Sequence, residues 1–231
     1  MSYPGSKAQA GVWQRIIGQM PPHCIYIEPF FGSGQVFWRK RPATGSYLLD
    51  LDPAVLNVKA DAGAGVHFLC ENAFEFLSSI AGRGRHPKWA SLNTEYTLIY
   101  CDPPYPLSTR NYRPYYRHEL NDQEHTSLLT LLQGLKCRVL ISSPVCDLYS
   151  SQLRTWRCIS YRTRWHDKTV TECLWCNFPE PGELHDWRYA GQNFRQRTGL
   201  KRLARRWLAK LEGMAPRKRG YVLDAIAQRY S

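Results

Sequence analysis

The sequence predicts an α/β fold: an open, twisted, mostly parallel sheet with helices on both faces and a terminal antiparallel β-hairpin. Short apolar runs rich in β-branched and aromatic residues alternate with helical stretches, which is typical of βαβ units. We expect strands near residues 25–28, 46–50, 66–70, 97–101 and 138–142. Two last runs, near 156–164 and 171–178, lie close enough in sequence to pair as the hairpin.

A glycine turn follows the first expected strand and precedes an apolar run that we expect to be helical. The turn consists of Glu28, Pro29, Phe30, Phe31, Gly32, Ser33 and Gly34. Its glycines would let the backbone approach a bound adenosyl group closely, and the third glycine of a dinucleotide fingerprint is missing. Strand, turn and helix therefore indicate the first unit of a nucleotide-binding fold, with an ordinary turn as the alternative.

The second expected strand ends in two carboxylates. Asp50 lies 16 residues after Gly34, close to the interval at which an acid binds a ribose diol. Asp52 precedes Pro53 and is expected to cap a helix that begins at this proline.

The run 97–101 ends abruptly in the tetrapeptide Asp102-Pro103-Pro104-Tyr105. Asp102 and the carbonyl of Pro103 can each accept one N–H of an exocyclic amine, which favours a nitrogen lone pair that points at an electrophile. Pro104 stiffens the loop and Tyr105 offers a face on which a base can stack. The alternative is a strand that ends at prolines, with an aspartate that caps a turn.

In this order, the motifs resemble those of the Dam-like (D12 class) DNA adenine-N6 methyltransferases, over roughly residues 3–178. The resemblance implies a Rossmann-like fold, S-adenosylmethionine as cofactor and a catalytic loop at Asp102, Pro103, Pro104 and Tyr105. It also implies that Tyr3 and Lys7 belong to an opening motif that helps to hold the methionine end of the cofactor. The other implied cofactor contacts are Glu28, Pro29, Phe30, Gly32, Gly34, Asp50 and Asp102. Residues 141–144 and 172–178 resemble later motifs of the family.

The chain departs from the family pattern in two places. Asn72 stands where the family often has an acid that meets the adenine amine of the cofactor, and an asparagine carbonyl can still accept that N–H. Longer relatives insert a target-recognition domain before the catalytic strand, whereas this chain has only about residues 82–89 there. Loops would therefore have to read the target sequence.

Composition predicts one catalytic domain, residues 1–187, and a basic helical extension, residues 188–231. The chain of 231 residues is long enough to bury a sizeable core. It has neither an apolar targeting region nor a lipid-spanning stretch, so we expect a cytoplasmic protein. The eight cysteines are scattered and lack the paired spacing of a zinc site, so we expect structural thiols and no metal.

Most of the net charge of +12 lies in the extension, which has 12 Lys or Arg and 2 acids, a net of +10. One helical face there is apolar, and we expect it to dock on the core or on a second helix near residues 221–228. The other face is basic and includes Arg202, Arg205 and Arg206, which we expect to bind DNA phosphates. The alternatives are a solvated face without a partner, or a helix on a membrane surface.

A second expected DNA contact follows the catalytic loop, where residues 109–118 interleave cations with aromatic rings. We expect Arg110, Tyr112, Arg113 and Arg117 to grip the backbone and stack bases. A purely structural loop is the alternative, because Tyr and Arg also pack on surfaces.

We therefore predict an S-adenosylmethionine-dependent enzyme that methylates N6 of a flipped adenine in DNA. N4-cytosine methylation uses the same amine geometry, and RNA or a protein glutamine could also supply the nitrogen. A non-catalytic nucleic-acid module that kept the fold is the remaining alternative. No obligate protein partner is evident, and the oligomeric state stays open.

Overall fold

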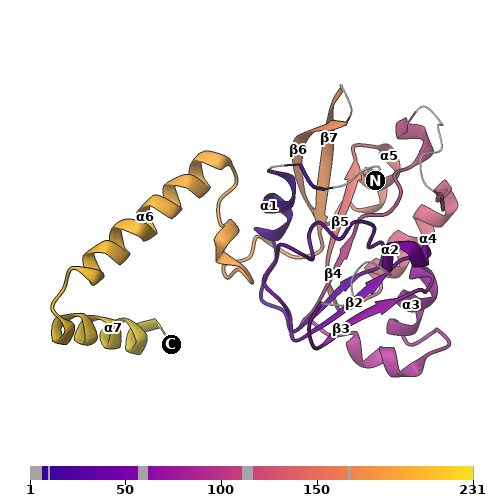
Figure 1. Ribbon diagram of the computed structural model, residues 1–231. Coiled ribbons are helices and arrows are strands. Elements are labelled where there is room, and N and C mark those ends of the chain that lie inside the picture. Colours follow the sequence, from indigo (N-terminus) through magenta and orange to yellow (C-terminus); the bar gives the residue numbers. More distant parts are fainter. Residues whose placement is uncertain (1–6, 10, 57–61, 111–116, 166–167, 231) are drawn as a thin grey trace.

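The computed structural model describes residues 7–9, 11–56, 62–110, 117–165 and 168–230. Its centre is a seven-stranded sheet in the order β3-β2-β1-β4-β5-β7-β6 (Figure 1). The strands are β1 (Ile25–Glu28), β2 (Gly45–Leu49), β3 (Val66–Leu69), β4 (Thr97–Cys101), β5 (Arg138–Pro144), β6 (Arg157–Trp165) and β7 (Lys168–Cys176). The pairings among β1 to β5 are parallel, and β7 runs antiparallel to both β5 and β6. The predicted fold class, including the terminal hairpin, is confirmed.

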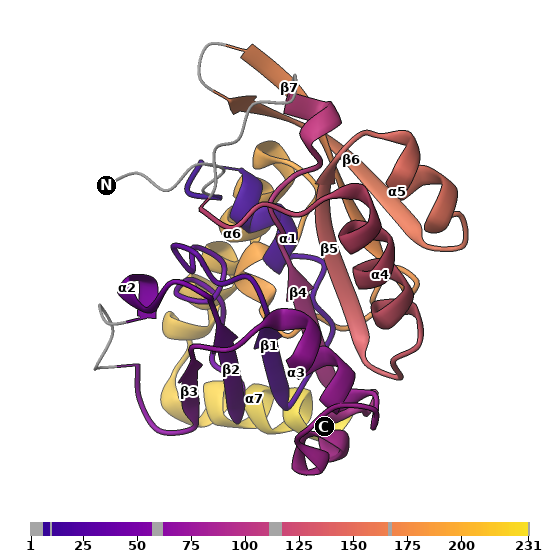
Figure 2. The same cartoon turned by 90° about the vertical axis from the view of Figure 1, so that its right-hand side faces the viewer.

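Helices cover both faces of this sheet. The α-helices are α1 (Val12–Ile17), α2 (Pro53–Leu56), α3 (Ala73–Ile80), α4 (Asp122–Gln133), α5 (Asp147–Gln152), α6 (Phe194–Glu212) and α7 (Pro216–Tyr230). Short 3₁₀ turns span η1 (Pro87–Leu92), η2 (Leu107–Arg110) and η3 (Trp187–Tyr189). Figure 1 shows α1 on one side of the sheet and α3, α4 and α5 on the other, and Figure 2 looks toward the α3–α5 side.

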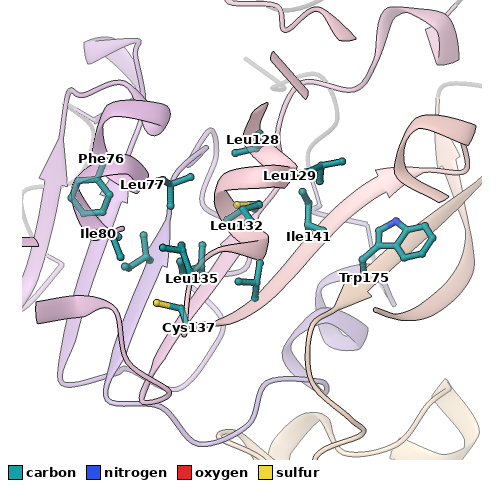
Figure 3. Close-up of a cluster of buried hydrophobic side chains, with 14 of the residues drawn as sticks. Phe76, Leu77, Ile80, Leu128, Leu129, Leu132, Leu135, Cys137, Ile141 and Trp175 are labelled. Carbon is teal, nitrogen blue, oxygen red and sulfur yellow. The ribbon is translucent and has the colours of Figure 1, made fainter. Parts of the chain in front are cut away.

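Side chains that alternate along the strands divide the interior into two cores. On β4, Ile99 belongs to the core beneath α3, α4 and α5, whereas Leu98 belongs to the core beneath α1. Figure 3 shows the first core, where side chains of α3 and α4 such as Leu77 and Leu132 meet the sheet. Because β4 is buried on both faces, its sequence is a continuous apolar run and lacks a polar alternation.

The strand order reverses between β1 and β4, so the chain leaves these two neighbouring strands toward opposite sides. In open α/β sheets this switch point is where ligands bind, just beyond the carboxyl ends of the strands. Glu28 is the last residue of β1, Asp50 follows β2 and Asp102 follows β4. Three carboxylates therefore gather at one edge of the sheet.

The helix expected after Gly34 does not form. Residues 35–39 make hydrogen-bonded turns, including Trp38 N–H to the Gly34 carbonyl at 3.0 Å. The segment is short because Gly34 has a left-handed φ of 61° and Pro42 restricts the residue before it. So few residues gain too few hydrogen bonds to offset helix nucleation.

The C-terminal extension also differs from the expectation. Neither α6 nor α7 has a buried residue, and Trp207, Leu208 and Tyr221 are exposed. Figure 1 shows α6 leaving the sheet beside α1, with α7 folding back at its far end. Of the two expected partners of the apolar face, the core and a second helix, the core is excluded because α6 points away from the sheet. No described helix combines the length and apolar character that crossing a membrane requires.

The root of this extension is nevertheless held firmly. Asp186 is fully buried, accepts the Arg41 backbone N–H at 2.9 Å and pairs with Arg188 at 2.6 Å. The ring of Tyr189 packs edge-on against Trp13, just after α1 begins. These contacts fix the point from which α6 departs.

Candidate active site

A pocket of about 290 Å³ opens at the switch point of the sheet. Among the described residues that line it are six acids and one lysine: Glu28, Asp50, Glu71, Asp102, Glu119, Glu124 and Lys7. The pocket of this basic protein is therefore acidic. Such a lining attracts a cationic ligand and disfavours one that carries a pyrophosphate.

The glycine turn forms one wall of this pocket. Gly32 has a φ of 48°, and its N–H donates to Asp50 Oδ2 at 2.9 Å. A Cβ on Gly34 would lie only 2.3 Å from the Phe31 ring, so the φ of 61° and the close packing both require glycine there. The turn is thus shaped by its glycines and tied to the end of β2.

Asp50 and Asp52 occupy different positions at the end of β2. Asp50 lines the pocket, and its second oxygen, Oδ1, accepts the Asp52 N–H at 2.9 Å. Each carboxylate oxygen keeps a further lone pair for a ligand hydroxyl. Asp52 Oδ1 accepts the Ala54 N–H at 3.0 Å as α2 begins, which confirms the expected helix cap.

The remaining expected cofactor residues also lie in the pocket wall. Pro29 and Phe30 line it beside Glu28, which is buried and accepts the Tyr26 hydroxyl at 2.8 Å. Asn72 lines the pocket too, and its Oδ1 caps α3 by accepting the Phe74 N–H at 2.8 Å. Its side chain is thereby oriented, and the carbonyl oxygen has a second lone pair for an amine.

The tetrapeptide turns away from β4 with its acid at the pocket. Asp102 and Pro104 line the cavity, whereas Pro103 is buried beneath the loop. Tyr105 is not among the lining residues: its hydroxyl accepts a hydrogen bond from the Lys7 ammonium, which also lies 4.8 Å from its ring centroid. The structure thus brings Asp102 to the wall of the pocket and sets Tyr105 beside it, against Lys7.

Lys7 connects several parts of this site. Its Nζ lies 2.9 Å from Asp102 Oδ1 and 3.5 Å from Glu172 Oε2, and only 5% of its side chain is exposed. Burial disfavours its charge, but the carboxylates of Asp102 and Glu172 outweigh that effect and raise the pKa of Lys7 well above its usual value. Lys7 is therefore a buried cation shared by two acids.

The pKa of Asp102 is raised above the usual value for an aspartate. Burial is the main cause that raises its pKa to about 6, and the negative charge of Glu172 adds to it. Lys7 opposes this shift through its charge and hydrogen bond. Because the Lys7 ammonium is shared by the carboxylates of Asp102 and Glu172, it offsets only part of the rise in the pKa of Asp102.

Arg110 has a different place from the one expected of a DNA contact. It is buried, and its guanidinium pairs with Glu119 through Nη1 to Oε1 at 3.1 Å and Nη2 to Oε2 at 2.5 Å. Its Nε also donates to the Tyr105 carbonyl at 2.9 Å. The guanidinium of Arg110 is therefore turned inward, where it supports the loop that contains Tyr105.

The other expected DNA contacts are placed as follows. Arg117 is exposed and lies 3.5 Å from Asp52 in a surface ion pair. Arg202, Arg205 and Arg206 are exposed on α6. Tyr112 and Arg113 lie outside the described residues, and so does Tyr3, which was expected to contact the cofactor.

Sequence reasoning missed Glu172 and Glu119. Glu172 is the only acid in the strand that ends the hairpin, and a charge within a buried strand signals a partner elsewhere in the fold. Glu119 had no such signal, because its partner Arg110 lies across a loop. On the same strand as Glu172, Trp175 belongs to the core, and its indole N–H donates to the Ser143 hydroxyl.

One comparison with known proteins finds a family whose model resembles part of this chain. The model for the D12 class N6 adenine-specific DNA methyltransferases matches residues 89–167, about a third of the chain. No curated protein is similar enough to match.

Among solved structures, an S-adenosylmethionine-dependent methyltransferase from Agrobacterium tumefaciens has 12% identity and a TM-score of 0.46, covering 72% of this chain and 60% of its own. An rRNA methylase from Streptococcus thermophilus has 10% identity and a TM-score of 0.41, covering 71% and 90%. A magnesium protoporphyrin IX methyltransferase from Synechocystis has 12% identity and a TM-score of 0.42, covering 72% and 75%.

The family match spans the catalytic loop and stops short of the glycine turn. It supports methyl transfer at the level of the family. The resemblance to the D12 class N6 adenine-specific DNA methyltransferases that the motifs predicted is confirmed over residues 89–167.

Proposed function

We propose that this protein transfers a methyl group from S-adenosylmethionine to the N6 amine of adenine in DNA. The observation that carries the proposal is the acid of the tetrapeptide, Asp102, in the wall of the same pocket as the glycine turn and Asp50. The family match over residues 89–167 supports adenine as the target base and DNA as the substrate.

The pocket fits the proposed cofactor. S-adenosylmethionine, when bound, supplies an electrophilic methyl group on a sulfonium. The six acidic side chains of the lining suit a ligand with a sulfonium and an ammonium, and they would repel the phosphates of a dinucleotide. Asp50 would bind the ribose hydroxyls and Asn72 the adenine edge, while Gly32 and Gly34 leave room for the nucleoside.

Asp102 and the backbone after it would prepare the target amine. The conjugated amine is a poor nucleophile because its lone pair is delocalised into the ring. Asp102 and the Pro103 carbonyl can each accept one N–H, and this holds the nitrogen in a geometry that frees the lone pair. An ionised Asp102 also stabilises the positive charge that develops on nitrogen, whose proton then becomes acidic enough to leave.

The target base must leave the DNA duplex to reach this edge of the sheet, at a cost of a few kcal/mol. Arg117 and the basic face of α6, with Arg202, Arg205 and Arg206, would bind the phosphates and offset that cost. Tyr105 would contribute its ring beside the base.

The alternatives differ in substrate. N4 of cytosine, an RNA base or a protein glutamine offers a similar nitrogen, and a non-catalytic module would transfer nothing. The match to an adenine-specific DNA methyltransferase family over the segment that contains Asp102 favours a nucleobase.

A methyl-transfer assay with radiolabelled S-adenosylmethionine tests the proposal. Duplex DNA, structured RNA and an unfolded protein are supplied as substrates in parallel reactions. Label in DNA, on adenine after digestion to nucleosides, is the expected outcome. Label on cytosine, RNA or protein alone would replace the proposed substrate. Binding of DNA without transfer to any of the three would indicate the non-catalytic module.

A further inference from the structure

The shared lysine gives Glu172 a role beyond the strand in which it lies. Glu172 is on β7, 9% of its side chain is exposed, and its Oε2 lies 3.5 Å from Lys7 Nζ. The same oxygen accepts the hydroxyl of Tyr161 at 3.0 Å. Tyr161 is its cross-strand neighbour on β6, so the antiparallel hairpin itself holds this carboxylate in place.

Glu172 does not line the ligand pocket, so it is not placed to touch a substrate or cofactor there. Glu172 acts on the reacting atoms only through Lys7, which lies between Glu172 and Asp102. The three side chains together carry two negative charges and one positive charge. The cluster is therefore one negative charge in excess when both acids are ionised.

We infer that Glu172 is a positioning residue that anchors Lys7 from behind, so that the lysine orients Asp102 without fully neutralising it. Lys7 without Glu172 would be a one-to-one partner of Asp102 in a buried site, and Asp102 would lose much of its capacity to accept the target N–H. With Glu172 the excess negative charge stays next to the place where nitrogen becomes positive. This inference deepens the proposed function and rests on it.

Among the described residues, Lys7 and Glu172 are the charged groups that act most strongly on Asp102. The electrostatic causes that shift the Asp102 pKa are Lys7, which lowers it, and Glu172, which raises it. Tyr100 on β4, Tyr161 on β6 and Tyr149 on α5 also interact with Asp102. Burial raises the pKa of each of these hydroxyls, so all three stay neutral where Asp102 titrates.

The remaining neighbours lie on β4 and β1. Burial raises the pKa of Cys101, and it raises that of Tyr26, whose hydroxyl is also bonded to Glu28. Both groups therefore stay neutral near pH 6. Glu172 is thus the acid of the β6–β7 hairpin whose charge acts on Asp102.

The test is a carboxyl carbon-13 NMR titration of Asp102 in the full chain labelled at aspartate, with the resonance assigned from Asp102→Asn. In the wild type its midpoint should lie at about pH 6. Glu172→Gln keeps the side-chain shape and removes the charge, so the Asp102 midpoint should move to lower pH. Lys7→Met should move it the opposite way, upward by about one unit or more.

Two variants control for mere structural disturbance. Glu172→Asp keeps the negative charge and should leave the midpoint near the wild-type value. Glu75→Gln removes an acid from the exposed ion pair with Arg85, and it should leave the Asp102 titration unchanged.

An unmoved or raised Asp102 midpoint in Glu172→Gln would overturn the inference. If that variant does not fold, a midpoint in Glu172→Asp that departs from the wild-type value would overturn it. The acid limb of kcat/KM for methyl transfer should shift in the same direction as the midpoint. The NMR titration needs no turnover. Absence of transfer in the wild type would therefore refute the proposed function without altering the result for Glu172.

Discussion

Replacement of Arg110 by methionine distinguishes two possible roles of this residue, stabilisation of the fold and DNA binding. Only 1% of the Arg110 side chain is exposed, and 20% of that of Glu119 is exposed. Removal of the guanidinium leaves the Glu119 carboxylate largely buried without its bidentate partner. It also removes the donor to the Tyr105 carbonyl.

The expected cost follows from this geometry. Breaking a buried ion pair from one side costs about 3–5 kcal/mol, and the partial exposure of Glu119 points to about 3 kcal/mol. With an m-value of about 2 kcal/mol/M in urea, the unfolding midpoint should fall by about 1.5 M. The double variant Arg110→Met/Glu119→Gln should recover part of this loss, because no unpaired charge remains buried.

Urea unfolding followed by circular dichroism measures both variants, and DNA binding at several salt concentrations measures the alternative role. A loss below about 1 kcal/mol, together with a smaller salt slope for DNA binding, would refute the buried role. That result would support the DNA contact that the sequence predicted for Arg110.

Three further predictions follow from the site and the extension. The raised pKa of Asp102 lies at about 6, so its ionised form is lost as pH falls below that value. We therefore expect kcat/KM to drop roughly tenfold between pH 7 and pH 5. A flat pH profile would show that the ionisation of Asp102 does not affect the reaction. Gly34→Ala should abolish cofactor binding measured by calorimetry, since its Cβ would lie 2.3 Å from a ring carbon, whereas Gly182→Ala meets nothing within 4 Å and should bind normally. Charge reversal of Arg205 and Arg206 should reduce the salt slope of DNA binding by about 2; an unchanged slope would exclude α6 from the interface.

Local patterns predicted the strands and the edge at which the site lies. Thr97–Cys101 is a short apolar run that two prolines stop, and its position and burial follow from those residues alone. Asp50 and Asp52 could likewise be assigned from their place after a strand and before a proline. In parallel sheets, residues that follow successive strands meet at one edge, so local sequence was sufficient there.

Contacts between distant segments could not be predicted in the same way. Lys7 meets Glu172 only because the last strand of the hairpin lies next to β5, and nothing near either residue signals the other. Arg110 was expected at the surface because arginines near aromatic residues often bind nucleic acid. Its burial depends on Glu119, which the fold brings back beneath the loop.

The exposed face of α6 shows a different limit. Its apolar and basic residues segregate as the sequence pattern indicated, but periodicity says nothing about which surface an amphipathic helix contacts. The anchored root at Asp186 directs α6 away from the sheet, and that direction depends on the tertiary contact with Arg41 and on the local ion pair with Arg188.

The most direct measurement is mass-spectrometric detection of N6-methyladenine in duplex DNA after incubation with S-adenosylmethionine and either the wild type or Asp102→Ala. We predict methylated adenine with the wild type and none with Asp102→Ala, while calorimetry shows that the variant still binds the cofactor. Equal methylation by both proteins, or none by the wild type, would contradict the assignment of this sheet edge as the site of methyl transfer.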